Sequence, residues 1–370
     1  MPVIFTKDQL RFSVESATGG QQTVLYDDKG YPTIVQIIPK FNIEDVAPSL
    51  GSGVHPAFIV GGVEKPYIYI AVYPAAVMDD RAVSMAGLTP RNYVSYDQAK
   101  QYCTSKGAGW HLMTNWEWAA IVLWCIKNGF QPRGNTNYGR AHDATFEVGA
   151  RDDKLAPGVV SGIARTLAGS GPASWRHNNS FPGIADLVGN IWEWQHGLKI
   201  VDGKIYMTND NDFNLAETQW PAQGVYFDAS TGPIGGNSSA ANGAPILSNG
   251  VSKYTETPTP AGGGDERDIT YTQITGETGW QQMALSAGYA GLTLAVRQRM
   301  AQALIAPKVA TADPAIVAKG YVGIRNYGER LPFRGGPWSY GATAGLAALA
   351  LNNRRSYSYY NVGFRPAFIA

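Results

Sequence analysis

The residues best suited to catalysis or metal binding are two cysteines and five histidines, and their spacing predicts no reaction centre. Cys103 and Cys125 are the only cysteines, too few for a disulfide framework. The histidines lack the short spacings that metal sites use; they are His55, His111, His142, His177 and His196. The sequence also lacks the nucleophile-elbow and phosphate-loop patterns. We therefore expect a protein that is not an enzyme.

The tyrosines, serines and asparagines near the C-terminus indicate a different chemistry, that of molecular recognition. Tyr357 and Tyr359 alternate with Ser356 and Ser358, so in an extended segment the two tyrosines share one face. Tyrosine supplies large, stiff contact area, and tyrosines beside asparagine build the adaptable binding surfaces of antibody loops. The alternative is an ordinary loop and strand end that closes the domain.

Composition excludes several classes of partner. The chain has 370 residues, of which 44% are hydrophobic and 16% charged, with a net charge of +1 and no basic run. It therefore lacks the electrostatic footprint of a nucleic-acid-binding protein. No stretch approaches the roughly 18 apolar residues of a membrane span, so we expect no membrane insertion. The start lacks the pattern of a signal peptide, which predicts synthesis in the cytoplasm.

Two helices and several strands must position these residues. One helix is predicted to begin at Ser95 and end at Gly107, and another to begin at Thr114 and end at Asn128-Gly129, because each has a glutamine or glutamate three residues after the N-cap. Cys103 and Cys125 fall on their apolar faces, so we expect buried thiols; the alternative is a contact between the helices that could oxidise. Strands are predicted at 33–38, 57–60 and 67–73.

The remaining segments suggest the domain organisation. Residues 1–45 are interpreted as a short β-rich N-terminal segment, and residues 46–370 as one domain. Residues 130–180 are rich in Gly, Asn and Arg, which predicts a loop. The region around 200–320 is interpreted as an insertion with little regular structure, because 200–265 is polar and Gly-rich, although 280–304 has helical composition.

Three ordered motifs carry a resemblance to a known family. They are Gly109–Ala120 (GWHLMTNWEWAA), Asp186–Trp194 (DLVGNIWEW), and Phe333–Trp338 (FRGGPW) followed by Gly363-Phe364-Arg365. In this order they resemble the formylglycine-generating-enzyme branch of the C-type lectin fold, over roughly residues 50 to 370. The resemblance implies an α+β, C-type-lectin-like fold. It says little about activity, because fold and function separate easily.

The motif residues have the properties of a scaffold. Gly335, Gly336 and Gly363 allow tight backbone turns. The large apolar side chains of Trp192, Trp194 and Trp338 suit a core with few helices. Arg334 and Arg365 can hold carboxylates or carbonyls with a forked set of donors. We expect these residues to be structural.

The family's catalytic apparatus is missing from the places where the resemblance would put it. Formylglycine-generating enzymes use a cysteine pair near the last two motif segments, and residues 320–370 contain no cysteine. The related iron oxygenases need a histidine cluster. Sugar-binding C-type lectins carry an EPN or QPD triplet, which Gln131-Pro132-Arg133 only half matches, and a WND triplet, which is absent. We therefore expect no required cofactor and no calcium-dependent sugar site of that kind.

One metal site is implied by the resemblance. In the enzyme branch, the turn that contains GNxWEW binds a structural calcium. The matching residues are Asp186 and Glu193 by side chain, with Gly189 and Ile191 by backbone carbonyl, and such oxygen ligands suit calcium. The alternative is that Asp186 and Glu193 hold local groups of the protein without a metal.

The segment 338–362 resembles the variable region of diversity-generating-retroelement proteins, in which template asparagine codons are randomised at their adenines. Ten residues, here called the variable positions, match template asparagines: Ser339, Tyr340, Thr343, Ala350, Asn352, Asn353, Tyr357, Tyr359, Tyr360 and Asn361. All are Asn, Ser, Thr, Tyr or Ala, which AAC reaches by changes in its first two bases. The residues between them, such as Trp338 and Gly345, are interpreted as fixed framework.

This second resemblance implies a receptor-binding or display protein. Its variable positions would bind a protein or cell-surface ligand, and it would act on a phage particle or a cell surface. Several copies would add avidity, so a homo-oligomer stays open. Two alternatives remain, a formylglycine-generating-type oxidase homologue and a structural or lectin-like particle component of fixed specificity.

Overall fold

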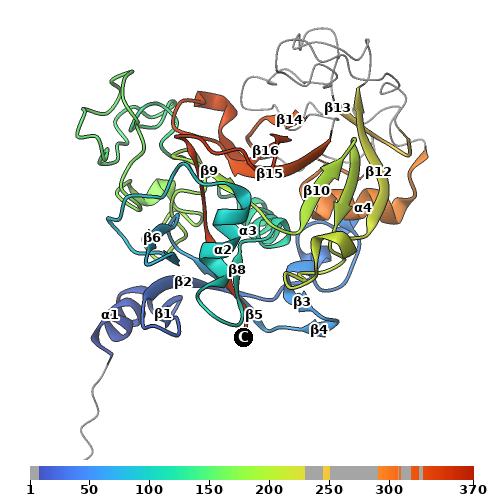
Figure 1. The fold of residues 1–370 in the computed structure, drawn as a ribbon, viewed down its shortest axis with the longest axis horizontal. Helices are drawn as coiled ribbons and strands as arrows, with labels where there is room; N and C mark the ends of the chain where they lie inside the picture. Colours follow the sequence, from blue (N-terminus) through green and yellow to red (C-terminus); the bar gives the residue numbers. More distant parts are fainter. Residues whose placement is uncertain (1–7, 230–244, 251–290, 307, 310–317, 325–327) are drawn as a thin grey trace, which may run out of the picture.

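The computed structural model describes residues 8–229, 245–250, 291–306, 308–309, 318–324 and 328–370 (Figure 1). Its helices are α1 (Gln9–Thr18), α2 (Tyr96–Thr104), α3 (Asn115–Lys127) and α4 (Leu294–Gln302). The first half of the chain contains strands β1 (Gln22–Tyr26), β2 (Pro32–Pro39), β3 (Ile59–Val60), β4 (Val63–Glu64), β5 (Tyr67–Ala71), β6 (Ala76–Met78), β7 (Arg81–Val83) and β8 (Trp110–Leu112). The second half contains β9 (Trp192–Trp194), β10 (Leu198–Val201), β11 (Lys204–Met207), β12 (Ala222–Ala229), β13 (Pro245–Ser248), β14 (Val322–Ile324), β15 (Glu329–Gly335), β16 (Gly345–Asn353), β17 (Val362–Phe364) and β18 (Pro366–Phe368).

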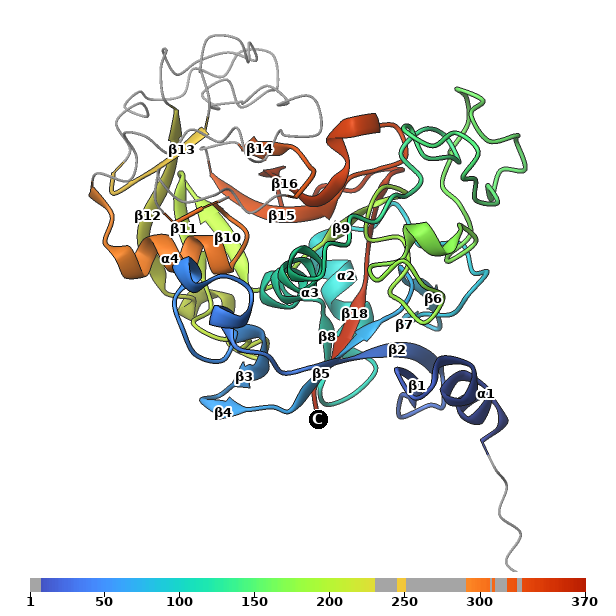
Figure 2. The ribbon, with the colours of Figure 1, turned by 180° about the vertical axis from the view of Figure 1, so that it is seen from behind.

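One sheet joins the two ends of the chain in the order β1-β2-β5-β18-β8. The C-terminal strand β18 is antiparallel to both β5 and β8 and lies between them (Figure 2). Strand β2 pairs with β5 over Val35↔Ala71 to Pro39↔Tyr67. The expected strand at 33–38 is confirmed, but the N-terminal segment also contains helix α1, and its strands belong to this shared sheet.

A second, larger sheet carries the segment that resembles a variable region. Its order is β13-β12-β11-β10-β15-β16-β14, with β9 pairing both β15 and β17. Strand β16, drawn in red in Figure 1, is antiparallel to β15 and parallel to β14. Of the motif strands, β15 is therefore the direct neighbour of β16, whereas β9 pairs with β15 and β17 pairs with β9.

Helices α2 and α3 begin as the sequence predicts. Both have capping boxes, Ser95 with Gln98 and Thr114 with Glu117. The α3 helix is buried on almost all sides, and its apolar residues share one core cluster with residues of both sheets, including Ile70 of β5 and Ile200 of β10. The expected burial of Cys103 and Cys125 as free thiols is confirmed.

The region around 200–320 differs from the expected irregular insertion. Strands β10, β11 and β12 form an antiparallel meander that extends the larger sheet, and β10 pairs with β15. Ile205, Val225 and Phe227 are fully buried in the main core. The error arose because Gly203 and other turn residues dominate the composition, whereas burial of the short strands depends on β15, which is distant in sequence. Residues 230–244 and 251–290 lie outside the described residues.

Two further expectations are refined. Residues 57–60 form a 3-10 turn (Pro56–Phe58) and the short strand β3 instead of one strand. Residues 130–180 contain, as expected, no strand within this fully described stretch, apart from isolated bridges.

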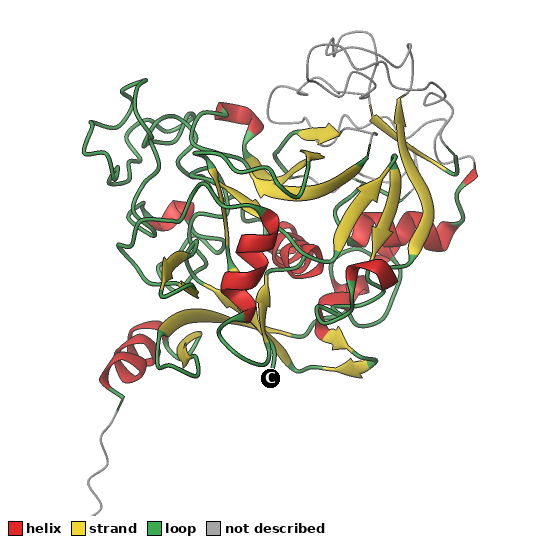
Figure 3. Cartoon of the chain, viewed as in Figure 1, coloured by secondary structure: helices red, strands yellow, loops and turns green. Residues whose placement is uncertain are grey.

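The result is a mixed α and β fold with curved sheets and few helices, which confirms the coarse α+β expectation (Figure 3). No helix among the described residues is both long and apolar enough to cross a membrane.

Candidate functional site

Nine of the ten variable positions line a single pocket of about 210 Å3. Its framework part consists of Trp192, Tyr321 and Phe333, which are buried. The variable positions in the lining are Ser339, Tyr340, Ala350, Asn352, Asn353, Tyr357, Tyr359, Tyr360 and Asn361. They come from β16, from the turn before it, and from the segment between β16 and β17. Tertiary structure thus gathers residues that the sequence shows only as a scattered set.

The tyrosines form one connected aromatic surface. Tyr357 and Tyr359 are 37% and 43% exposed, with ring centroids 5.9 Å apart. Tyr359 and Tyr360 have ring centroids 4.2 Å apart. The segment forms no strand, and Tyr357 and Tyr359 lie side by side in it.

The framework supports this aromatic surface from below. The Tyr357 ring lies 6.0 Å from that of Phe333 on β15. The Tyr340 ring packs edge-on against Trp192 at 5.5 Å and tilted against Tyr321 at 5.7 Å. The exposed rings therefore rest on a buried aromatic floor.

Strand β16 adds neutral hydrogen-bonding groups. The side-chain amide nitrogen of Asn353 donates to the side-chain oxygen of Asn352 at 2.7 Å. Each amide carries both donors and acceptors, so the pair keeps hydrogen-bonding capacity toward a ligand. No side chain in the lining carries a formal charge. Burial also raises the pKa values of Tyr340, Tyr357 and Tyr360, so their hydroxyls are neutral at physiological pH.

Three variable positions are less accessible than a display surface requires. Thr343 is outside the pocket lining and 6% exposed, and its hydroxyl donates to the backbone oxygen of Tyr340 at 2.6 Å. Ala350 is fully buried, and Asn361 is 9% exposed. Thr343 and Ala350 therefore shape the surface from beneath, which corrects the expectation that all ten side chains are presented.

The motif residues hold this site in place, as expected. Gly335 and Gly336 have φ values of +90° and +85°, which disfavour any side chain. A Cβ on Gly363 would lie 2.5 Å from the backbone oxygen of Arg91. The buried Arg334 donates to the side-chain oxygen of Asn115 at 2.7 Å and to the backbone oxygen of Leu304 at 3.2 Å.

The candidate calcium residues lie close together but have other partners. The Glu193 carboxylate receives two hydrogen bonds from Arg365, at 2.6 and 2.9 Å, in a fully buried pair. The Asp186 carboxylate accepts the backbone N–H of Gly169 at 2.7 Å. Gly189 and Ile191 are buried in the same turn. A guanidinium on Glu193 supplies the positive charge that a calcium ion would supply, so these residues as placed do not fit the ion.

Chelation tests this assignment. We expect an excess of EDTA to leave the urea midpoint of unfolding unchanged, because Arg365 already neutralises Glu193. The measurement is unfolding followed by tryptophan fluorescence, with calcium-saturated and EDTA-treated samples in parallel. A midpoint that falls on chelation and returns with added calcium would restore the calcium hypothesis.

The two cysteines lack the features of reactive thiols. Burial raises the pKa values of the Cys103 and Cys125 thiols, which disfavours the reactive thiolate. Among the described residues, no three His, Cys, Asp or Glu side chains are grouped so as to hold a metal ion.

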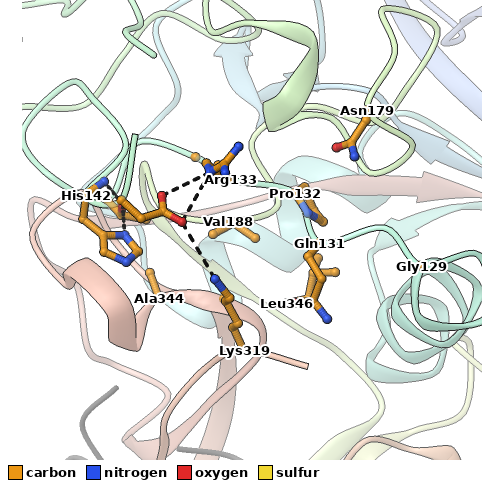
Figure 4. Close-up of a pocket in the computed structure, with 14 residues that line it drawn as sticks. Gly129, Gln131, Pro132, Arg133, His142, Asn179, Val188, Lys319, Ala344 and Leu346 are labelled. Atoms are coloured by element: carbon orange, nitrogen blue, oxygen red, sulfur yellow. Dashed lines mark hydrogen bonds and ion pairs between the residues drawn. The ribbon is translucent and has the colours of Figure 1, made fainter. Parts of the chain in front are cut away.

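A second pocket, of about 290 Å3, gave no signal in the sequence (Figure 4). It lies between the loop after α3 and the start of β16. The Asp143 carboxylate lies there between Arg133, at 3.3 Å, and Lys319, at 3.8 Å. These residues are distant in sequence, so no local pattern could have found the pocket.

The comparisons with known proteins add no relative to this picture. No protein-family model matches the chain, and no curated protein matches it. The argument for a function therefore rests on the site geometry and on the ordered motifs.

Proposed function

We propose that this protein is a non-catalytic ligand-binding protein whose C-terminal variable positions contact the ligand. The observation that carries the proposal is the gathering of nine predicted positions in one pocket. All nine lie within residues 339–361, and this segment folds so that they line the same cavity. An aromatic pocket with neutral polar groups suits adaptable recognition.

The proposal extends to the fold family and to the origin of the site. The C-type-lectin-like fold is supported by the motif residues, since Trp194, Arg334 and Arg365 are all fully buried, as a scaffold role requires. Diversification by a retroelement is supported by the residue types at the ten variable positions, which are limited to five that AAC reaches by changes in its first two bases. The ligand is a protein or cell-surface group, and the protein acts on a phage particle or cell surface.

The direct test removes the aromatic surface. Replacing Tyr357, Tyr359 and Tyr360 together by alanine is expected to weaken target binding at least about 100-fold, because aromatic anchors dominate such interfaces. The urea midpoint should change little, since Tyr357 and Tyr359 are exposed. Binding is measured on cells or particles sampled from a population that carries the gene. The control is Tyr67→Ala, which removes a tyrosine that is 47% exposed on β5, away from the pocket.

Two outcomes would contradict the proposal. Unfolding of the triple variant would show that the tyrosines are core residues. Unchanged binding would place the contact surface elsewhere. Sequencing the 3′ end of the gene across that population provides a second arm: substitutions should concentrate at the ten variable codons and spare Trp338 and Gly363.

The alternative of a formylglycine-generating-type oxidase shares the ordered motifs but lacks the cysteine pair that the resemblance would require. Residues 320–370 contain no cysteine, and Cys103 and Cys125 are buried on helices α2 and α3. A structural particle component of fixed specificity predicts invariant codons at the variable positions, which the sequencing arm separates from our proposal.

A further inference from the structure

The segment that carries the three tyrosines has a fixed path although it forms no strand. This segment, residues 354–361, is here called the tyrosine loop; it connects β16 to β17. Three of its backbone oxygens accept hydrogen bonds from residues 92–96. The donors are the Tyr96 N–H to Arg355 at 3.1 Å, the Tyr93 N–H to Tyr359 at 3.0 Å, and the Asn92 side-chain amide to Tyr360 at 2.7 Å.

These ties involve backbone groups of the loop and none of its tyrosine side chains. Tyr96 is the first residue of α2. The N–H groups in the first turn of a helix have no partner within that helix. The Arg355 oxygen therefore satisfies a donor that would otherwise need water. Substitutions at Tyr357, Tyr359 and Tyr360 leave all of these bonds possible.

One loop side chain, that of Arg355, binds three other elements at once. Its guanidinium makes two hydrogen bonds of 3.0 Å to Glu329, at the start of β15. It also donates to Asp97 in the first turn of α2 at 2.7 Å and to Glu217 at 2.6 Å. The charge lies 5.3 Å from the centre of the Tyr96 ring. Three carboxylates thus converge on one arginine.

The charges around Arg355 are balanced. Lys100 binds Glu217 at 2.8 Å, and Lys199 lies 3.5 Å from Glu329. Burial alone would raise the pKa of Glu217, but hydrogen bonds from Arg355 and Lys100 lower it to about 2. Removing the arginine would leave three carboxylates facing two lysines, an excess of negative charge next to the loop.

We propose that Arg355 is a positioning residue, whose bonds to Asp97, Glu217 and Glu329 hold the tyrosine loop in its binding conformation. The inference rests on the proposed function. Arginine is suited to the role because its planar fork can reach several carboxylates, whereas lysine presents a single point charge. The loop can therefore change its tyrosines and keep its path, because the groups that fix that path are backbone oxygens and the Arg355 side chain, and none is a variable side chain.

Hydrogen exchange of the full-length protein tests the proposal without a ligand. In Arg355→Met, the amides of Tyr93 and Tyr96 are expected to exchange at least about tenfold faster, because they lose their acceptors when the loop opens. Exchange in α3 should stay unchanged. In Arg355→Lys, the exchange rates of these two amides should lie between those of the wild type and those of Arg355→Met. The matched control is Arg354→Met, since Arg354 is the exposed neighbour in the same loop.

A salt series on the wild type provides a second measurement that does not depend on a folded variant. About 1 M sodium chloride screens exposed ion pairs, so exchange at Tyr93 and Tyr96 should rise in the wild type. Where Arg355→Met folds, salt should not raise its exchange further. The proposal would be overturned if Tyr93 and Tyr96 exchanged at the wild-type rate in Arg355→Met. It would also be overturned if Arg354→Met accelerated their exchange as much as Arg355→Met does. If Arg355→Met unfolds globally, the exchange rates of Arg355→Lys and the salt series on the wild type test the proposal instead. Failure of the proposed function would be seen in a different experiment, as target binding that is unchanged when the three tyrosines are replaced by alanine.

Discussion

Replacing Arg365 by methionine is expected to lower the free energy of unfolding by roughly 3–5 kcal/mol, the range for a buried ion pair that loses one partner. Arg365 is fully buried between the two sheets, where it binds Glu193 and donates to the backbone oxygens of Ala71 at 2.8 Å and Ala185 at 2.9 Å. Methionine fills similar volume but leaves the Glu193 charge without a partner. Urea unfolding, followed by tryptophan fluorescence, measures the loss.

A double variant separates the charge from the packing. Arg365→Met combined with Glu193→Leu removes both charges and should recover part of the lost stability, because no buried charge is then left alone. Burial already raises the pKa of Glu193 even beside Arg365. The deficit of the single variant should therefore shrink at low pH as Glu193 takes up a proton. A loss no larger than that of the exposed control Arg354→Met would contradict this account.

Mild acid is expected to unfold the protein, because three histidines are buried in their neutral form. Burial lowers the pKa of His55 to about 4 and the pKa values of His177 and His196 to about 3. The unfolded state, with a histidine pKa of about 6.5, binds more protons below that pH. The stability from these histidines is fully present above about pH 6.5 and is lost as the pH falls toward 4 for His55 and toward 3 for His177 and His196.

The size of the acid effect follows from the number of histidines. Each contributes about 1.4 kcal/mol per pH unit once the unfolded form is protonated, so the three reach about 4 kcal/mol per unit. The pKa of Glu217 is lowered to about 2, so this residue adds a further loss of stability as the pH falls below the usual pKa of a glutamate. The buried Asp186 and Glu193 oppose this trend, because their pKa values are raised and the folded state takes up their protons more readily.

Urea unfolding between pH 7.5 and 4.5 measures the slope. The informative variant is His177→Asn, since the asparagine oxygen can replace Nδ1 as acceptor of the Ile184 N–H, a bond of 2.8 Å. This variant should flatten the slope by about 1.4 kcal/mol per pH unit, the contribution of one histidine. A stability that is constant across this range would show that the histidines are not buried as neutral groups.

Much of the local structure could be predicted from the sequence. The starts of α2 and α3 follow from capping residues within four positions of each other, and the burial of Cys103 and Cys125 follows from helical periodicity. The scaffold role of Trp192 and Arg334 was also predictable. Such features depend on near neighbours in the chain, so a short window of sequence contains their cause.

Other features depend on partners that no short window contains. The strands between 198 and 229 were missed because their burial depends on β15. Helix α1 was missed for a different reason: none of its residues is fully buried, so it shows no strongly apolar face. Thr343 and Ala350 were assigned to the surface, whereas the turn before β16 and the strand's packing bury them. The partners of Arg355 lie on three separate elements and are invisible in sequence.

The sequence by itself determined which positions resemble template asparagines, because the residue types at those positions can be recognised one by one. The tertiary structure alone decided that nine of these positions form one pocket, that Glu193 binds an arginine, and that the tyrosine loop is tied to α2 and β15. The physical reason is distance along the chain. Local preferences fix single elements, whereas pockets and ion pairs arise only when packing brings distant elements together.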